Sequence, residues 1–314
     1  MSIKCAFLFA GQGSQSLGMG RDFFDNSEVA KKMLIDASVR TGIDLSELLF
    51  EENFLLAQTE YTQPAILLVG AMAHQLFVDA TNIKPVLTMG HSLGEFTALV
   101  ASGALDAVDA VELVNLRGQL MADACAKQEV GMLVSLGLGD EAVENICEAQ
   151  RAEGKQVWAV NYNADGQIVI AGIKKDLETL VPVLKEAKAR RAMLLDMSVA
   201  SHCPLLESAS APLEAKLQEL LKDAFIAPVI SNVTAKAYSS KAEALDLLPQ
   251  QLVKPVLYKH SMANIDDEVD CYIEFGHGKV LKGLNKKATK KPHFNVFDMA
   301  SLAETIEAVK ALDV

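Results

Sequence analysis

The chain has 314 residues, of which 50% are hydrophobic, and this is enough for a large core in one large domain or two unequal ones. Its formal net charge of −12 at pH 7 argues against general nucleic-acid binding, and five scattered cysteines without a Cys-x-x-Cys pair predict a reducing compartment, no disulfide framework and no metal site. The apolar stretches at residues 5–10 and 65–73 are too short for a signal-peptide core and a bilayer span, so we expect a cytoplasmic protein that does not enter a membrane.

The first predicted element is a buried strand over residues 5–10, which runs straight into the glycine-rich loop GQGSQ at 11–15. In hydrolase-like sheets the loop after an early strand often supplies a backbone N–H to an oxyanion hole, and Gln12, between two glycines, is the candidate here. A phosphate-cradling loop or a plain turn is the alternative. The P-loop pattern is not met, because no Gly-Lys-Ser/Thr follows.

An apolar helix is predicted next. We expect it to open at Thr62-Gln63-Pro64, with the threonine as its cap and the proline in its first turn. Residues 65–76 are apolar almost all round, which predicts that this helix is buried.

The segment GHSLG at 90–94 has the Gly-x-Ser-x-Gly spacing of a nucleophile elbow, where a strand turns sharply into a helix with Ser92 at the apex. The motif is common by chance, but here a short apolar run precedes it and a predicted helix follows it. Gly90 and Gly94 fit the tight turn, because a Cβ at either position would clash with the neighbouring strand and helix. Glu95 falls in the first helical turn, where a carboxylate favours the positive end of the helix dipole.

A long helix is predicted over about 107–126, with Asp106 as its cap. Arg117 lies on its apolar face, because apolar residues flank it at helical spacings. One interpretation is an arginine at the edge of that face, reaching solvent or pairing with Glu112 or Asp123. The other is a buried guanidinium that awaits a carboxylate from outside the fold. Periodicity alone does not decide between them.

From residue 129 the pattern changes to four strands and two helices. We predict strands at 131–136, 156–160, 167–171 and 192–199, and helices at 140–151 and 177–189. Their β-α-β-β-α-β order is the ferredoxin-like signature. The sequence therefore predicts an α/β fold: a hydrolase-like catalytic domain with a parallel sheet, made from residues 1–127 and 199–314, and an inserted ferredoxin-like subdomain at 128–198.

His202 is the candidate base for Ser92. It stands at a strand end, before a helix opened by Pro204, and an isolated loop histidine is often only a structural residue. The argument is elimination among six histidines. His91 adjoins the serine, so in a sharp elbow its side chain should point away, and three others lie in an apolar helix or in charged stretches. His277 also follows a predicted strand and is the remaining competitor.

The last third of the chain adds strands at 229–233, 272–275 and 294–297, and a closing helix at 303–312. Between the last two strands, residues 276–291 carry six lysines and no acidic residue. We expect several of these lysines to share one face over one or two helical turns.

Together these motifs resemble the malonyl-CoA:acyl carrier protein transacylases of bacterial fatty acid synthesis, over nearly the whole chain. The resemblance rests on FAGQGSQ at 9–15, TQPA at 62–65, GHSLGEF at 90–96, LRG at 116–118, SHCPLL at 201–206, QLVKPV at 251–256 and GHGKVLKGL at 276–284. Seven motifs in the family's order are much more specific than the elbow alone. The resemblance implies that Ser92 is the nucleophile, that His202 is its base and that Arg117 binds the malonyl carboxylate.

The same resemblance implies roles for three further residues. Gln12 and Leu93 become backbone donors of the oxyanion hole, and the main-chain carbonyl of Gln251 orients the catalytic histidine. The chain departs from the family at His277, where a proline is usual, and at 163–165, where Asn-Ser-Pro is usual. The first departure concerns the conformation of that loop, and the second concerns a hairpin turn of the subdomain.

The implied reaction is ping-pong transfer of malonyl from malonyl-CoA, through malonyl-Ser92, to the thiol of an acyl carrier protein. No cofactor is expected, because the coenzyme A thioester is itself the substrate, and we expect a monomer. Carrier proteins are strongly acidic, so an acidic enzyme needs a local basic surface to receive one. The candidate docking residues are Lys286, Lys287, Arg190 and Arg191. Solvated charges that only aid solubility are the alternative.

Two other functions fit parts of the pattern. A serine esterase or thioesterase has the same elbow and differs in the acceptor, which is water instead of a thiol. A non-catalytic binding or scaffold subunit could keep the fold, but the presence of Ser92, His202 and Arg117 together argues against it.

Overall fold

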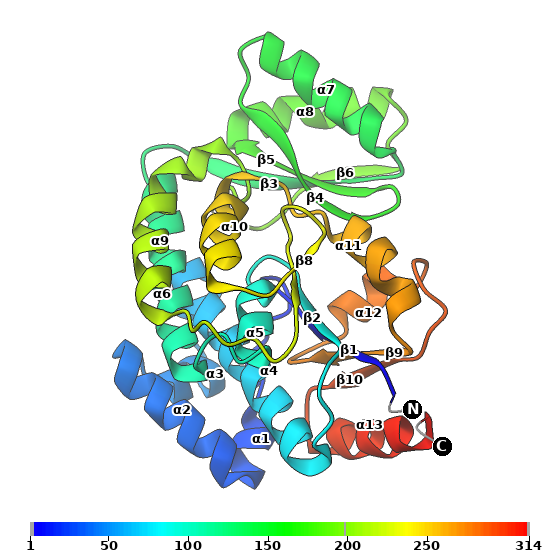
Figure 1. Ribbon diagram of the computed structural model, residues 1–314. Coiled ribbons are helices and arrows are strands. Elements are labelled where there is room, and N and C mark those ends of the chain that lie inside the picture. Colours follow the sequence, from blue (N-terminus) through cyan, green and yellow to red (C-terminus); the bar gives the residue numbers. More distant parts are fainter. Residues whose placement is uncertain (1–2, 198, 313–314) are drawn as a thin grey trace.

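Short apolar strands that alternate with helices build two sheets in the computed structural model, which describes residues 3–197 and 199–312 (Figure 1). The larger sheet has the strand order β10-β9-β1-β2-β7-β8. Its strands are β1 (Cys5–Phe9), β2 (Leu87–Gly90), β7 (Val229–Ile230), β8 (Ala237–Tyr238), β9 (Cys271–Phe275) and β10 (His293–Val296). All neighbouring pairs are parallel except β7 and β8. This confirms the predicted parallel sheet and adds an antiparallel edge strand.

The predicted strand at 229–233 is shorter in the structure, because the chain turns back after Ile230. The Ala235 amide donates to the Ser231 carbonyl at 2.9 Å, and Ala235 has a positive φ of 55°. This tight turn leads directly into β8.

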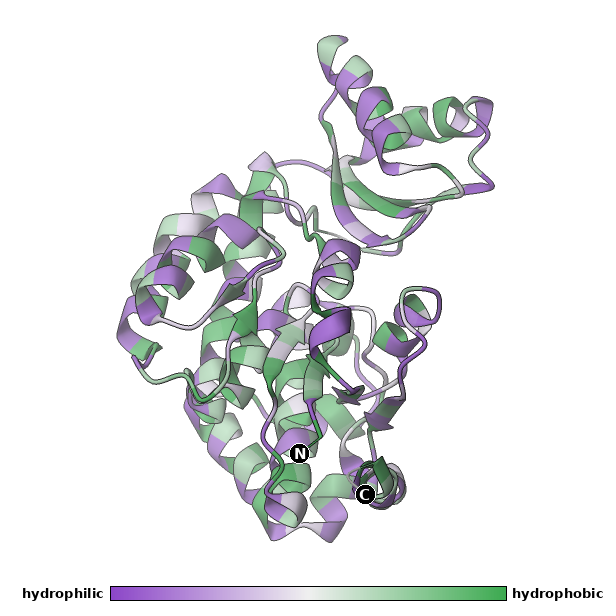
Figure 2. Ribbon diagram, turned by 45° about the vertical axis from the view of Figure 1, so that its right-hand side comes forward, coloured by the Kyte–Doolittle hydropathy of each residue, from purple (hydrophilic) through white to green (hydrophobic). Residues whose placement is uncertain are grey.

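Helices cover both faces of the larger sheet, as expected for buried parallel strands. The helices of this larger unit, some of which pack on other helices, are α1 (Arg21–Asn26), α2 (Glu28–Thr41), α3 (Leu45–Phe50), α4 (Thr59–Thr81), α5 (Gly94–Ala101), α6 (Ala107–Cys125), α9 (Glu207–Leu220), α10 (Lys241–Val253), α11 (Tyr258–Ile265), α12 (Val280–Asn285) and α13 (Met299–Leu312), with the short 3₁₀ turns η1 (Leu55–Ala57), η2 (Pro204–Leu206) and η3 (Asp266–Glu268). Figure 2 shows hydrophobic residues gathered in the interior of this unit and polar residues on its outer faces.

Helix α4 begins at Thr59, so the prediction that it opens at Thr62 is wrong. The Thr62 hydroxyl donates to main-chain carbonyls of the preceding turn and does not cap the helix. Pro64 therefore lies inside the helix, where it cannot donate to the carbonyl of Glu60. The side-chain amide of Asn115 on α6 donates to that carbonyl instead, at 2.7 Å. A neighbouring helix thus satisfies the acceptor that the proline leaves open.

Helix α4 is long and apolar enough to cross a membrane by length and composition, but it is packed in the core of this fold. In its most apolar window 61% of the helix is buried. Most of its buried apolar residues belong to the main hydrophobic cluster, together with residues of α5, α6 and the sheet. We therefore interpret it as a core helix.

Gly118 lets α6 pack closely against the first turn of α4. A Cβ at this position would lie 2.5 Å from the Cα of Glu60 and 2.8 Å from the carbonyl oxygen of Thr59. We expect Gly118→Ala to lower the free energy of unfolding by roughly 1–3 kcal/mol, because overpacking outweighs the better helix propensity of alanine. Denaturant unfolding measures this. Gly283→Ala, on α12 with nothing within 4 Å of the new Cβ, is the matched control and should be neutral or stabilising. Equal stabilities of the two variants would contradict the packing argument.

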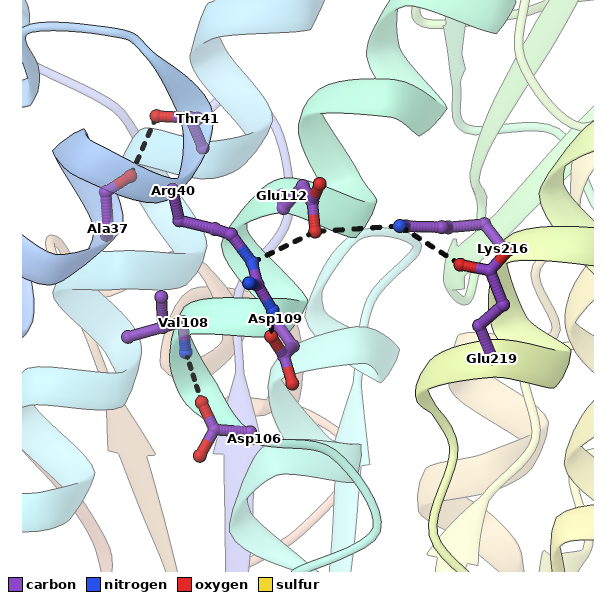
Figure 3. A network of polar contacts seen from close by, with 9 residues as sticks. All are labelled: Ala37, Arg40, Thr41, Asp106, Val108, Asp109, Glu112, Lys216 and Glu219. Carbon is purple, nitrogen blue, oxygen red and sulfur yellow. Dashed lines mark hydrogen bonds and ion pairs between the residues drawn. The ribbon is translucent and has the colours of Figure 1, made fainter.

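Charged side chains tie α2, α6 and α9 together at the surface (Figure 3). Arg40 of α2 pairs with Asp109 and, at 3.1 Å, with Glu112, both on α6. Lys216 of α9 lies 3.7 Å from Glu112 and 3.2 Å from Glu219 of its own helix. Exposed pairs of this kind contribute about 0–1 kcal/mol each. Their importance here is that Glu112 is already paired with two surface cations.

The smaller sheet has the strand order β4-β5-β3-β6, with every pair antiparallel. Its elements are β3 (Val130–Leu136), α7 (Asp140–Ala152), β4 (Val157–Ala164), β5 (Gln167–Ile173), α8 (Lys174–Glu186) and β6 (Arg191–Leu194). This is the predicted ferredoxin-like order, and all six elements fall between residues 128 and 198. Ser198, at the end of the predicted last strand and of the predicted subdomain, lies outside the described residues. In Figure 1 this unit lies above the larger one.

Alternation along β3 and β5 gives the smaller sheet two different faces. Met132 and Val169 belong to the main hydrophobic cluster of the larger unit. Their chain neighbours Leu133, Ile168 and Ile170 belong to a separate cluster with α7 and α8. Successive side chains of a strand point to opposite faces, so one face holds the small unit together and the other faces the large unit.

Candidate active site

The segment from β2 to α5 folds as the predicted elbow. Ser92 has a positive φ of 52°, a conformation that non-glycine residues rarely adopt and that is typical of strained functional turns. A Cβ at Gly90 would lie 1.8 Å from the carbonyl carbon of Gly94, and one at Gly94 would lie 2.0 Å from the carbonyl oxygen of Phe9. Only glycine fits at either position, as the sequence predicted.

His202 lies next to this serine. The Ser92 Oγ is 2.7 Å from the Nε2 of His202, and the Nδ1 of His202 is 2.6 Å from the main-chain carbonyl of Gln251. A carbonyl oxygen only accepts, so Nδ1 carries the proton and donates it. Nε2 is therefore free to accept the serine proton. The histidine is buried, and this burial, followed by the positive charge of Arg117, lowers its pKa from 6.5 to about 3.

His277 does not reach the serine. Its Nε2 lies 2.7 Å from the hydroxyl of Ser16, in the loop after β1. The structure therefore brings His202 to the elbow and leaves the competing histidine outside it.

Arg117 is buried beside the same serine, with an exposed fraction of only 1%. Its Nη1 donates to the Oε1 of Gln63 at 2.6 Å, and its Nη2 donates to the Oε1 of Gln251 at 3.0 Å and to Ser92 Oγ at 3.3 Å. The guanidinium lies 5.2 Å from the centre of the Phe96 ring. Among the described residues its hydrogen-bond acceptors are neutral, and its Nε has no partner.

This geometry decides between the two interpretations of Arg117. It does not lie at the surface: it is 1% exposed, and the hydrogen bonds described for it go to Gln63, Ser92 and Gln251 and not to Glu112 or Asp123. Burial lowers the pKa of Arg117 to about 10, and the charge of Glu95 acts in the opposite direction. The guanidinium therefore stays charged at neutral pH in a site lined with neutral acceptors, which is an arrangement suited to an anionic group.

Sequence reasoning missed Asn232, which holds the elbow from the β7–β8 turn. Its Oδ1 accepts from the Ser92 amide at 2.6 Å, and its Nδ2 donates to the Gly90 carbonyl at 2.7 Å. No local pattern marks Asn232, since only the order of strands in the sheet brings β7 beside β2.

Sequence reasoning also missed the contacts of Glu95. It lies in the first turn of α5 as predicted, but it is 1% exposed and points into the protein. Its Oε2 accepts from Gln251 Nε2 at 2.7 Å and from the Asn232 amide at 3.1 Å, and its Oε1 accepts from the Tyr238 hydroxyl at 3.1 Å. Burial raises the pKa of Glu95 to about 7, although these hydrogen bonds and the charge of Arg117 act to lower it.

Gln12 and Leu93 come from two different segments of the chain and both lie at the cavity over Ser92. The loop after β1 packs on the elbow so closely that a Cβ at Gly11 would lie 2.3 Å from the carbonyl oxygen of His91. The side chain of Gln12 accepts a hydrogen bond from Thr59 at 2.9 Å. Leu93 is the N-cap residue of α5. Both residues line the cavity described next.

A cavity of about 160 Å³ lies over the serine between the two units. The larger unit contributes Gln12, His91, Ser92, Leu93, Arg117, Met121, Ser201 and His202. The smaller unit and the segment after β6, which ends at Leu194 and is shorter than the predicted strand at 192–199, contribute Met132, Asn161, Asn163, Val169, Leu195 and Met197. Contrary to the expectation that its side chain points away, His91 lines the cavity. Its Nε2 contacts the Oδ1 of Asn163 at 2.7 Å, so it bridges the two units. Within residues 3–197 and 199–312 no three His, Cys, Asp or Glu side chains gather where they could hold a metal ion.

The four candidate docking residues are exposed, and none is among the described residues that line this cavity: Lys286, Lys287, Arg190 and Arg191. Five of the six lysines line one surface cavity of about 590 Å³, so the expectation that several share one face is confirmed, although only Lys282 lies within α12: Lys279, Lys282, Lys286, Lys290 and Lys291. Lys291 is turned inward and donates to main-chain carbonyls, one of them Val269 at 2.6 Å.

The acyl transferase domain family model matches residues 6–305. The family match assigns this elbow and its inserted ferredoxin-like sheet to the acyl transferases. The malonyl CoA-acyl carrier protein transacylase of Bacillus subtilis is 39% identical over 92% of this chain and 91% of its own length, and that of Escherichia coli K12 is 37% identical over 90% and 92%. The chain belongs to the malonyl CoA-acyl carrier protein transacylase family.

Solved structures agree with this assignment. The malonyl-CoA:acyl carrier protein transacylase of Helicobacter pylori matches with a TM-score of 0.95 at 44% identity, covering 98% of this chain and 99% of that one. A malonyl-transacylase in complex with its type II PKS acyl-carrier protein matches with a TM-score of 0.93 at 35% identity, covering 97% and 99%.

Proposed function

We propose that this chain transfers malonyl from malonyl-CoA to the phosphopantetheine thiol of an acyl carrier protein, through a malonyl ester on Ser92. One observation carries the proposal: Ser92 Oγ lies 2.7 Å from an imidazole nitrogen of His202 and 3.3 Å from the guanidinium of Arg117. A nucleophile, its base and a fixed positive charge meet at one oxygen. The malonyl CoA-acyl carrier protein transacylases among its relatives support the choice of substrates.

In the first half-reaction His202 Nε2 accepts the hydroxyl proton while Ser92 Oγ attacks the thioester carbonyl. The backbone N–H groups of Gln12 and Leu93 are the proposed donors to the oxyanion that forms. The protonated histidine, held through Nδ1 by the Gln251 carbonyl, then returns the proton to the leaving thiolate of coenzyme A.

Arg117 is the proposed clamp for the free carboxylate of the malonyl group. A planar guanidinium offers two parallel hydrogen bonds, which a lysine ammonium does not. Because its protein partners are neutral amides and a hydroxyl, an arriving carboxylate brings the opposite charge into the site. The carboxylate is thereby fixed at one end of the substrate while the thioester carbonyl reaches Ser92 at the other.

In the second half-reaction the carrier thiol gives up its proton to His202 and attacks the malonyl ester, and the protonated histidine returns that proton to Ser92 Oγ as the serine leaves. No cofactor takes part in this scheme, because the energy of transfer lies in the thioester. We place the reaction in the cytoplasm, as the loading step of fatty acid synthesis, and propose that the chain acts as a monomer.

A direct assay tests this function. Malonyl-, acetyl- and methylmalonyl-CoA are offered with and without a holo carrier protein, and both acyl carrier and free acid are measured. We expect malonyl-carrier as the main product and a stable malonyl-enzyme when the carrier is omitted. Release of free malonate as fast as transfer would favour a thioesterase, and no adduct on Ser92 would favour a binding subunit.

The lowered pKa of His202 predicts how the base behaves with pH. The folded protein should keep this imidazole neutral from about pH 8 to about pH 5, whereas an ordinary histidine takes up its proton near 6.5. An NMR titration, with the His202 signal assigned from the His202→Ala variant, measures this.

Since only the unfolded chain gains this proton near pH 6.5, the contribution of His202 to stability decreases as the pH falls from 6.5 toward 3. A His202 titration midpoint near 6.5 would contradict the prediction.

The basic residues outside the cavity are the proposed docking surface for the acidic carrier. Lys287 lines a second cavity of about 470 Å³, and this cavity and the one over the serine share the lining residue Asn163, so the two cavities are neighbours. The double variant Lys286→Glu with Lys287→Glu should raise the KM for carrier protein and leave acylation by malonyl-CoA near normal. Added salt should weaken the wild-type carrier reaction.

A second charge reversal of equal size is the control for this docking prediction. Lys31→Glu with Lys32→Glu, on the remote helix α2, changes the net charge by the same amount and should leave the carrier KM unchanged. Arg190→Glu with Arg191→Glu tests the edge strand β6 in the same way. An unchanged carrier KM in the Lys286 and Lys287 double variant would reject that docking surface and leave the catalytic assignments intact.

A further inference from the structure

The buried carboxylate of Glu95 contacts two segments of the site, and the reaction scheme does not explain these contacts. Glu95 accepts from the side-chain amide of Gln251 and from the main-chain amide of Asn232, and Tyr238 closes its other side. All four residues are buried. The catalytic scheme uses the Gln251 main-chain carbonyl, and it gives no function to the Gln251 side chain or to Glu95.

The Gln251 side-chain amide has two possible orientations, and the ionised Glu95, the Ser92 carbonyl and Arg117 all favour the same one, with the shortest of the three contacts made to Glu95. Its Nε2 lies 2.7 Å from Glu95 Oε2 and 3.1 Å from the Ser92 carbonyl, and its Oε1 lies 3.0 Å from Arg117 Nη2. A carboxylate and a carbonyl only accept, so the amide nitrogen must face them. The amide oxygen then faces the guanidinium. In the reversed orientation the amide N–H groups would point at the donors of Arg117.

Resting on the proposed malonyl transfer, we propose that Glu95 is a positioning residue: it fixes the amide of Gln251 so that Arg117 is held in place to select an anionic acyl group. Glu95 acts on the guanidinium through this amide and makes no direct contact with it in the hydrogen bonds described above. This separation leaves the guanidinium without a carboxylate of its own. The substrate carboxylate therefore finds the arginine oriented, with its described hydrogen bonds made only to neutral groups.

The test compares how fast malonyl-CoA and acetyl-CoA acylate Ser92 in a single turnover, followed by intact mass. Glu95→Ala should lower the malonyl-to-acetyl ratio by about tenfold or more, because the freed amide no longer holds Arg117. Glu95→Gln keeps an oxygen toward Gln251, and its amide can face the Tyr238 hydroxyl, which is able to accept. It should therefore stay within about threefold of the wild-type ratio.

Two comparisons separate positioning from general damage. Glu274→Ala is the matched control, since Glu274 is equally buried and accepts from Leu281, Lys282 and Asn295 outside the site. It should lower thermal stability and leave the ratio unchanged. In a Gln251→Ala background, Glu95→Ala should change the ratio no further, because the amide through which it acts is gone.

The outcomes are distinct. A wild-type ratio near one would reject the proposed function itself. With a wild-type preference for malonyl, an unchanged ratio in Glu95→Ala would overturn this inference alone. An equal loss in Glu95→Gln and Glu95→Ala, or an additive loss in the double variant, would overturn it as well.

Discussion

Replacing Ser92 with alanine should abolish malonyl transfer, and replacing His202 with alanine should lower its rate by ~10²–10⁴, the range for loss of one acid–base group. The serine oxygen is the only proposed point of covalent attachment, so its removal leaves no acyl-enzyme. Without the imidazole, the hydroxyl keeps its place but loses the group that accepts its proton at 2.7 Å. Intact mass after mixing with malonyl-CoA measures the acyl-enzyme, and product formation with a carrier protein measures turnover.

His277→Ala is the natural control, because His277 contacts Ser16 and lies away from the elbow. We expect transfer by this variant to stay near the wild-type rate. A larger loss in His277→Ala than in His202→Ala would mean that the base has been assigned to the wrong histidine.

Arg117→Ala should reverse or abolish the preference of the enzyme for its charged substrate, malonyl-CoA, over acetyl-CoA. Malonyl transfer should lose roughly 2–5 kcal/mol of transition-state stabilisation, the usual cost of removing one partner of a buried charge pair. Acetyl-CoA has no carboxylate for the guanidinium, so its turnover should be spared or should rise. Comparison of kcat/KM for the two thioesters gives the change in selectivity directly.

Arg117→Lys separates charge from geometry at this position. It keeps a positive charge but cannot hold Gln63 and Gln251 and also present two parallel donors to a carboxylate. We expect intermediate malonyl activity. An equal loss of malonyl and acetyl transfer in the alanine variant would instead show that the arginine only supports the packing around Phe96.

The elbow could be predicted from the sequence because its causes are local. Strand, glycine, serine, glycine and helix follow one another directly, and the clashes at Gly90 and Gly94 come from segments that any such elbow brings together. The inserted sheet was predictable for the same reason, since its six elements follow one another along the chain in the β-α-β-β-α-β order. The start of α4 was not, because the position of Pro64 inside the helix depends on Asn115 from another helix.

The site beyond the elbow depends on contacts that a periodic pattern does not contain. Helical spacing placed Arg117 on an apolar face, but only the fold shows that Gln63 and Gln251 enclose it there. Asn232 follows a two-residue strand and meets the elbow only because β7 pairs with β2. Glu95 was visible as a helix-start carboxylate, and its inward direction follows from tertiary packing. Sequence therefore located the reacting groups, and the structure was needed for the residues that hold them.

The two-faced small sheet has a consequence for how this site can diversify. Met132 and Val169 close the cavity above Ser92, while the residues that hold the sheet to its own helices, such as Leu133 and Ile170, point the other way. A substitution of either wall residue therefore changes the room for an acyl chain and the contact between the two units, while the packing of the small sheet on α7 and α8 depends on the residues of its other face. The range of substrates can therefore change in evolution while the chemistry is kept. Residues that line the cavity and select the acyl chain alternate, along the same strands, with residues that support the subdomain.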